Sequence, residues 1–200
     1  MKVYPPIRQA GDRAALWDAV RDGTITSIGS DHAPHTREEK SQPLGSAPAG
    51  VAGVETLGAV LVDAMLRGQL TPERLAWVLS EGTARLYGLY PRKGALTVGA
   101  DADFTLVDPA GATVVDERRL HSKQPQTPWR GRRLRGAMRL TILRGEVVAR
   151  EGEPVGEPRG ELVRARHAPS EAANPLAFMR ELDEALAATP DVMPVFVLDD

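Results

Sequence analysis

The pattern of the chain changes near residue 90, and this change limits the folds that it can adopt. Before that point short helical and extended patterns alternate, whereas the residues that follow form β-type runs separated by turn residues. Sixteen prolines and nineteen glycines are spread over the 200 residues, which favours many short elements over long helices. We therefore predict an α/β region over residues 1–90 and a mostly β region over residues 91–165.

The first region begins with a helical pattern followed by an extended one. Asp12 precedes an amphipathic stretch, so we expect it to cap a helix over residues 13–20 that ends near Gly23. Residues 24–29 (TITSIG) alternate β-branched and small side chains, which predicts a strand that ends at Asp31. A helix followed by a strand is the unit from which α/β domains are built.

Two further helices are expected after a loop at residues 41–50, which is rich in glycine and proline. Residues 55–67 predict a helix that faces a core, with core positions at Leu57, Val60, Leu61, Ala64 and Met65. Thr71 can cap the next helix, and Pro72 fits its first turn, where the missing N–H breaks no hydrogen bond.

The second region contains three β-type runs, at residues 93–108, 112–115 and 138–150. We expect the last run to be a hairpin that turns at Arg144 and Gly145, because glycine adopts the positive φ that such turns need. The tail from about residue 166 predicts one more helix, over residues 175–188.

Composition excludes several classes of function. The formal net charge is −2 and the pI is about 6.1, which gives no basic footprint for a nucleic acid or an anionic membrane. The chain has no cysteine, which removes disulfides and thiolate metal sites and fits a reducing compartment. The first residues lack the apolar segment of a secretion signal, and the longest apolar run is far below the roughly 20 residues that span a bilayer. We therefore expect a cytoplasmic protein.

Two of the four histidines stand beside an acid in SIGSDHAPHTREEK, residues 27–40. Asp31 lies where the expected strand gives way to a loop, and barrel enzymes place catalytic groups at this end of their strands. There a carboxylate can bind a divalent metal or take a proton from water, and His35 can donate a hydrogen bond to an anionic substrate group. The alternative is a turn with solvated polar groups. His121 and His167 are isolated, which is typical of surface residues.

Five segments, taken together, resemble the dihydroorotases, which belong to the cyclic amidohydrolases. In chain order they are PPIR, SDHAPHTREEK, APAGVAGVET, KGALTVGADADFTLVD and SKQPQTPWRGRRLRGAMRLTILRGEVV. Such enzymes hold two zinc ions in a (β/α)₈ barrel and carry a small β-sandwich domain built from segments before and after the barrel. They close N-carbamoyl-L-aspartate reversibly to dihydroorotate in pyrimidine synthesis.

The resemblance implies a role for four residues. Asp31 matches the aspartate of the eighth barrel strand, which binds metal and acts as general acid and base. His35 matches the histidine that contacts the substrate carboxylate, and the backbone of Ala49 and Gly50 matches the loop that contacts the substrate ring. Tyr4 departs from the pattern, because an asparagine that contacts the substrate usually precedes the double proline.

The resemblance also implies an incomplete enzyme. A (β/α)₈ TIM barrel takes about 250 residues, so residues 1–90 supply only its C-terminal units, followed by part of the β-sandwich domain over residues 91–165. The family's other metal ligands would lie upstream of Met1, which leaves Asp31 as at most one zinc ligand. We expect the isolated chain to be inactive, with the missing barrel half or another subunit as its partner and a cyclic amide as its small-molecule substrate.

Two alternatives remain open. Hydantoinases usually carry cysteine and phenylalanine in the DHxPx positions, and allantoinases carry serine and cysteine, so the DHAPH of this chain favours dihydroorotase among the three. The second alternative is a non-catalytic scaffold, like the inactive dihydroorotase homologues that pair with aspartate transcarbamoylase. The missing metal ligands favour such a scaffold, and the presence of both Asp31 and His35 speaks against it.

Overall fold

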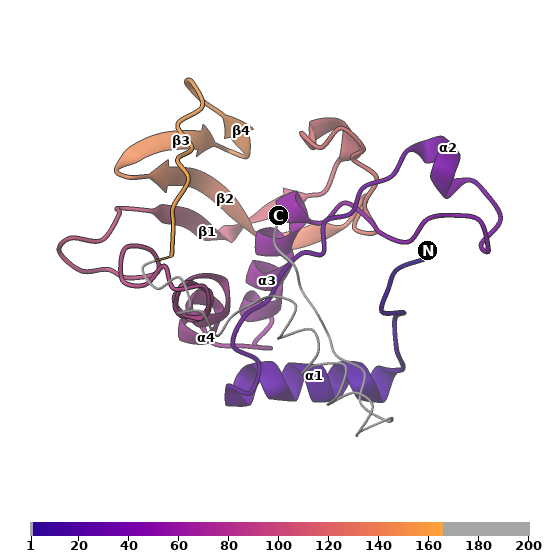
Figure 1. Ribbon diagram of the computed structural model, residues 1–200, viewed down its shortest axis with the longest axis horizontal. Coiled ribbons are helices and arrows are strands. Elements are labelled where there is room, and N and C mark those ends of the chain that lie inside the picture. The colour runs from indigo at the N-terminus through magenta and orange to yellow at the C-terminus, as the bar shows by residue number, and fades with distance from the viewer. Residues whose placement is uncertain (1, 166–200) are drawn as a thin grey trace, which may run out of the picture.

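The computed structural model describes residues 2–165, so His167 and the tail helix predicted over residues 175–188 lie outside the described residues. The helices of the first region are α1 (Ala10–Asp22), α2 (Arg37–Lys40), α3 (Val54–Leu66), α4 (Pro72–Ala76), a π-helical turn (Trp77–Glu81) and α5 (Gly82–Leu86). The second region contains β1 (Phe104–Val114), a 3₁₀ turn (Glu117–Arg119), β2 (Arg133–Leu143), β3 (Glu146–Arg150) and β4 (Glu153–Pro154). Figure 1 shows α3 against the sheet and α1 at the end of the molecule away from it.

Helix α1 confirms the first predicted helix but begins three residues earlier. Asp12 is not the cap; it lies in the first turn, where its carboxylate accepts a hydrogen bond from the backbone N–H of Gln9 at 3.0 Å. A carboxylate in this position also interacts favourably with the positive end of the helix dipole. Gly23 ends the helix with a φ of 99°, as the sequence predicts.

The strand predicted over residues 24–29 is wrong. The segment bonds to helical carbonyl groups: the N–H of Ile25 donates to Ala19 at 2.9 Å, and that of Ile28 donates to Val78 at 3.3 Å. A strand requires a ladder with a neighbour, and among the described residues the nearest approach to one is a single parallel bridge at His32. β-branched residues favour extended backbone, but they do not provide the partner strand.

Helix α3 confirms the predicted helix at residues 55–67 and forms the main contact between the two regions. Ala59 packs with Val115 and Leu134 in a buried cluster, and Val60, Trp129 and Met138 surround it. The predicted core positions are confirmed at Leu61 and Ala64, whereas Leu57, Val60 and Met65 are only half-buried.

A buried polar side chain also joins α3 to the sheet. Asp63 accepts a hydrogen bond from the backbone N–H of Arg135 in β2 at 2.8 Å and one from Nε of Arg67 at 2.7 Å. Its carboxylate is therefore fully partnered although the residue is only 8% exposed. The bond from Arg67, partly opposed by burial, holds the pKa of Asp63 below its usual value.

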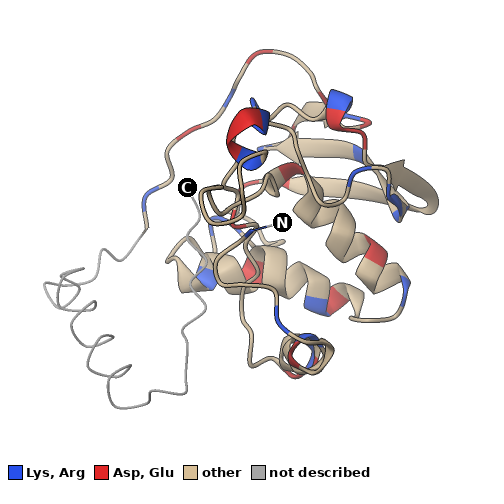
Figure 2. Ribbon diagram, turned by 90° about the vertical axis from the view of Figure 1, so that its right-hand side faces the viewer, with Lys and Arg blue, Asp and Glu red and all other residues tan. Residues whose placement is uncertain are grey.

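The helix predicted at Thr71 and Pro72 is confirmed as α4. The hydroxyl of Thr71 accepts a hydrogen bond from the N–H of Arg74 at 3.2 Å, and Pro72 is the first helical residue. Charged residues of both signs are interspersed over the described elements (Figure 2), in keeping with the small net charge. No helix within residues 2–165 is long and apolar enough to cross a membrane.

The sheet is antiparallel, with the strands in the order β1-β2-β3-β4. The predicted hairpin is confirmed: Arg144 and Gly145 have φ values of 48° and 83° and connect β2 to β3. The other boundaries differ, because β2 begins at residue 133 and β1 runs through Pro109. Proline is tolerated there because β1 is an edge strand and its register shifts between Asp108 and Ala112.

Candidate functional site

The backbone turns sharply at Asp31, just after the segment at residues 24–29. Its φ is 45°, in the left-handed region where aspartate is enriched among residues with a side chain, and the residue is exposed. The chain then runs beside Val51, to which Ala33 donates a backbone hydrogen bond at 3.0 Å. This turn leaves the Asp31 carboxylate accessible at the surface of the chain.

His32 fastens this segment to the start of α3. Its Nδ1 accepts hydrogen bonds from the backbone N–H groups of Gly53, at 3.1 Å, and of Val54, at 3.2 Å. An Nδ1 that accepts carries no proton, so the neutral ring is protonated on Nε2. Sequence reasoning missed this role, because His32 and the start of α3 are more than 20 residues apart in the chain.

His35 contacts the backbone of the loop at residues 41–50. Its Nε2 donates a hydrogen bond to the carbonyl oxygen of Ala49 at 2.8 Å, and its Nδ1 lies 3.6 Å from Oε2 of Glu39. The chain enters α2 through a capping box: the hydroxyl of Thr36 accepts a bond from the backbone N–H of Glu39 at 3.2 Å, and the carboxylate of Glu39 accepts one from the backbone N–H of Thr36 at 2.8 Å. The short helix therefore fixes the direction in which the chain leaves His35.

Gly50 has a backbone that other residues would adopt only with strain. Its φ is 122°, and a Cβ at this position would lie 2.5 Å from the carbonyl oxygen of Ala33. Its N–H donates to the carbonyl oxygen of Lys2 at 3.0 Å. The structure thus brings together three of the predicted site residues, His35, Ala49 and Gly50.

A pocket of about 130 Å³ lies beside these residues. The first region contributes His35, Lys40, Gly50, Val51 and Ala52 to its wall, and the second region contributes Gln126, Thr127 and Pro128. Asp31 is not one of the described residues that line this pocket. Both regions of the molecule therefore form the candidate site.

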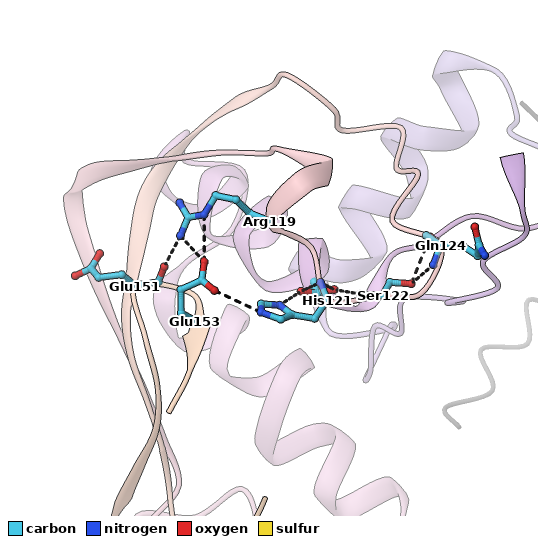
Figure 3. Close-up of polar contacts among 7 residues, drawn as sticks. Arg119, His121, Ser122, Gln124, Glu151 and Glu153 are labelled. Atoms are coloured by element: carbon cyan, nitrogen blue, oxygen red, sulfur yellow. Dashed lines mark hydrogen bonds and ion pairs between the residues drawn. The ribbon is translucent and has the colours of Figure 1, made fainter. Parts of the chain in front are cut away.

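We term residues 120–128 the strap, because they carry the chain from the sheet to this pocket. Glu55, in the first turn of α3, accepts bonds from the backbone N–H and Nδ1 of His121, at 2.8 and 2.9 Å, and from the N–H of Ser122 at 2.9 Å. Nε2 of His121 lies 3.5 Å from Glu153, which pairs with Arg119 at 2.8 Å. Figure 3 shows this cluster between β4 and the strap.

These contacts shift the pKa values of His121 and Glu55 in opposite directions. The hydrogen bond to Glu55 raises the pKa of His121 above its ordinary value, burial opposes the shift, and the charges of Glu55 and Glu153 add to it. Burial by itself would raise the pKa of Glu55, but the bonds from His121 and Ser122 outweigh it and lower that pKa. His121 is half-exposed, as predicted, but it is not isolated.

The described residues do not form a metal site by themselves. Within residues 2–165 no three histidine, aspartate or glutamate side chains come close enough to hold a metal ion. A zinc site needs at least three protein ligands, so Asp31 could contribute only one of them. The donor set of residues 2–165 therefore does not fit a metal ion held by these residues alone.

The class of protein follows from a match to a known family. A model described as "Amidohydrolase family" matches residues 8–148, and the chain belongs to the amidohydrolase family. Two relatives bear directly on the resemblance predicted from the sequence. The dihydroorotase of Anaeromyxobacter sp. (strain K) is 42% identical over 152 residues, which are 76% of this chain and 35% of that protein. The L-hydantoinase of Paenarthrobacter aurescens is 40% identical over 161 residues, 78% of this chain and 35% of that protein.

A solved structure leads to the same family. The L-hydantoinase (dihydropyrimidinase) from Arthrobacter aurescens superposes with a TM-score of 0.74 and 39% identity, over 78% of this chain and 36% of that one. The predicted resemblance to dihydroorotases is confirmed. The chain spans about a third of the length of the relatives that it matches.

Proposed function

We propose that the chain is the C-terminal part of a zinc-dependent, dihydroorotase-like cyclic amidohydrolase that interconverts dihydroorotate and N-carbamoyl-L-aspartate. The observation that carries this function is the hydrogen bond from His35 to Ala49 beside a pocket that His35 and Gly50 line, which brings together the residues that the dihydroorotase pattern assigns to the substrate. Residues 1–90 then provide the last units of a TIM barrel, and residues 91–165 provide part of the β-sandwich domain.

Asp31 acts as general acid and base in this reaction. In the hydrolytic direction its carboxylate takes a proton from the attacking water, whose oxygen bonds to the ring carbonyl carbon. The ring C–N bond then breaks, and the same proton passes to the leaving nitrogen. The zinc ligands other than Asp31 come from the missing barrel half or another subunit, because the described residues offer no complete set.

His35 recognises the carboxylate of the substrate. In the present structure its Nε2–H donates to the carbonyl of Ala49, so binding requires this donor to change partner. A bond to a carboxylate is charge-assisted and roughly twice as strong as one to a neutral carbonyl. The released carbonyl of Ala49 would then be free to accept a ring N–H, which places Ala49 and Gly50 along the edge of the substrate ring.

A hydantoinase is the second candidate. The L-hydantoinase relative is nearly as similar as the dihydroorotase, at 40% against 42% identity. Tyr4 replaces the asparagine of the dihydroorotase pattern and is 66% exposed, which removes one amide contact to the substrate. A hydantoin lacks the ring carboxylate, so it would make no use of His35.

Complementation tests the proposed function. The chain would be co-expressed with the upstream two thirds of the Anaeromyxobacter dihydroorotase, loaded with zinc, and assayed with dihydroorotate and with hydantoin. We expect hydrolysis of dihydroorotate, and Asp31→Asn should lower kcat by about 10²–10⁴-fold, the typical loss when a general acid and base is removed. Asp18→Asn, at an exposed position of α1, is the matched control.

The outcomes separate the candidates. Faster hydrolysis of hydantoin than of dihydroorotate would transfer the assignment to the hydantoinase. An assembled, fully zinc-loaded complex that hydrolyses neither ring would overturn both enzymatic proposals in favour of the non-catalytic scaffold.

A further inference from the structure

Lys40 ends the SIGSDHAPHTREEK segment, and the proposed reaction does not use it. Its ammonium nitrogen lies 2.9 Å from the carbonyl oxygen of Gly50, 3.0 Å from that of Pro48 and 3.4 Å from that of Lys2. All three acceptors are neutral backbone groups. Lys93 provides a contrast within the same chain, because it pairs with the carboxylates of Asp101 and Asp103.

The contacts of Lys40 and His35 together hold three consecutive carbonyl groups. Lys40 bonds to those of Pro48 and Gly50, and His35 bonds to the one between them, that of Ala49. The same carbonyl oxygen of Lys2 that faces Lys40 also accepts the N–H of Gly50 at 3.0 Å. Two side chains from one short motif therefore fix the whole backbone of residues 48–50.

We propose that Lys40 is a positioning residue, which holds the loop at residues 48–50 in the shape that contacts the substrate ring. Gly50 is the residue type that loses most conformational freedom on folding, so the loop needs such a restraint to keep its φ of 122°. An ammonium group has three rotatable donors that suit three converging carbonyls, whereas the donors of arginine are fixed in a planar fork. The part that concerns the substrate rests on the proposed function; the restraint of the loop does not.

A direct contact between Lys40 and an anionic substrate is the competing interpretation, since Lys40 also lines the pocket. Its three donors are already directed at carbonyl oxygens, and the residue is half-buried. The two roles differ in an observable way: a positioning residue restrains the loop without any substrate present.

The lack of cysteine permits a sharp test. In Lys40→Cys the single thiol is alkylated in denaturant, either with 2-bromoethylamine, which restores an ammonium at nearly the length of lysine, or with iodoacetamide, which gives a neutral side chain. After refolding, amide hydrogen exchange at Gly50 is measured by NMR on the isolated chain. We expect exchange about tenfold faster with the neutral side chain and within about twofold of the wild type after aminoethylation, because a lost local restraint raises local opening.

Three controls accompany this measurement. Lys123→Cys, at an exposed position, receives the same two treatments and should leave exchange at Gly50 unchanged. Protection of the β2 amides shows that each variant is folded. If refolding after alkylation fails, Lys40→Met replaces the neutral adduct. This variant keeps the aliphatic stem and should show the same faster exchange at Gly50. Unchanged exchange at Gly50 in the neutral variants would overturn the proposal.

The complemented enzyme tests the substrate part. We expect the neutral Lys40→Cys adduct to raise KM for dihydroorotate about tenfold with kcat within about twofold, and aminoethylation to restore KM, since a misplaced loop loses substrate binding before chemistry. Faster exchange at Gly50 with an unchanged KM would show that the loop does not bind the ring. That result would overturn the claim that Lys40 positions the loop for the substrate. If the wild-type complex hydrolyses no ring, the proposed function fails, and the exchange measurement alone decides the role of Lys40.

Discussion

Different bonds hold the segment at residues 24–53, which has no ladder beyond a single bridge, and the sheet at residues 104–154. In the sheet, neighbouring strands exchange backbone hydrogen bonds over long registers, as between β1 and β2. In the first segment, side chains bind the backbone: His32 accepts two N–H groups, and His35 and Lys40 donate to carbonyl groups. A backbone without a ladder is therefore held by single bonds, several of which come from individual side chains.

This difference has a consequence for single substitutions. A ladder spreads its stability over many equivalent bonds, so the loss of one side chain on the sheet surface changes little. The contacts of the first segment are few and specific, so the loss of one of them should release a local stretch without unfolding the sheet. Three predictions, from the largest expected effect to the smallest, test this comparison.

Asp63→Ala should have the largest effect, because it removes the carboxylate that joins the two regions. It leaves the backbone N–H of Arg135 without its acceptor at the part-buried contact with α3, and the loss of a hydrogen bond to a charged group costs roughly 1.5–3 kcal/mol. Urea denaturation followed by circular dichroism would measure the loss in the free energy of unfolding. Asp63→Asn, which keeps one acceptor oxygen, should lose less, and equal losses in the two variants would contradict this account.

Gly50→Ala should have a smaller, local effect. The added Cβ would lie 2.5 Å from the carbonyl oxygen of Ala33, and the φ of 122° is strained for alanine; such strain typically costs about 1–3 kcal/mol. Gly45→Ala is the matched control in the same loop, because a Cβ there meets nothing within 4 Å. Hydrogen exchange should accelerate around residues 48–53 while the β1 and β2 amides stay protected. Equally faster hydrogen exchange in residues 48–53 and in the sheet would contradict the proposal that the effect is local.

The smallest effect is a pH dependence at the strap. The folded pKa of His121 is raised by Glu55, so its contribution to stability is complete below the unfolded pKa of about 6.5 and is lost as pH rises through the folded value. The folded pKa of Glu55 is lowered, so its contribution is present above its unfolded value and is lost as pH falls through the folded one. The pair is thus most stabilising between about pH 4.5 and 6.5.

Thermal unfolding at pH 6 and pH 8 would measure this dependence. The wild-type midpoint should fall between these two values by more than that of His121→Gln. Glu153→Gln, which leaves the bond between His121 and Glu55 in place, should retain most of the difference. Identical pH profiles for the wild type and His121→Gln would contradict the assignment.

Local patterns explain which parts of the fold could be predicted. The helices at α1, α3 and α4 and the hairpin at Arg144 and Gly145 depend on caps, periodicity and turn residues that lie within a few positions of one another. The strand over residues 24–29 was mispredicted because a strand depends on a partner that its own residues do not specify.

The candidate site also contains residues that could be predicted from the sequence and contacts that could not. The resemblance named His35, Ala49 and Gly50, and the structure brings them together, whereas the roles of Asp31 and of zinc remain predictions. No spacing rule could have paired Glu55 with His121, which lies 66 residues further along the chain. The bonds from Lys40 to the loop were missed because backbone carbonyl groups leave no mark in a sequence.

If the pocket binds the substrate as proposed, the strap makes the second region part of the surface that selects it. Gln126, Thr127 and Pro128 face the pocket from the second region, opposite the residues that follow Asp31. Recombination between relatives that exchanged only the segment after residue 90 would therefore exchange one wall of the pocket together with the sheet. Chimeras of dihydroorotases and hydantoinases joined at this boundary should inherit ring preference from both parents.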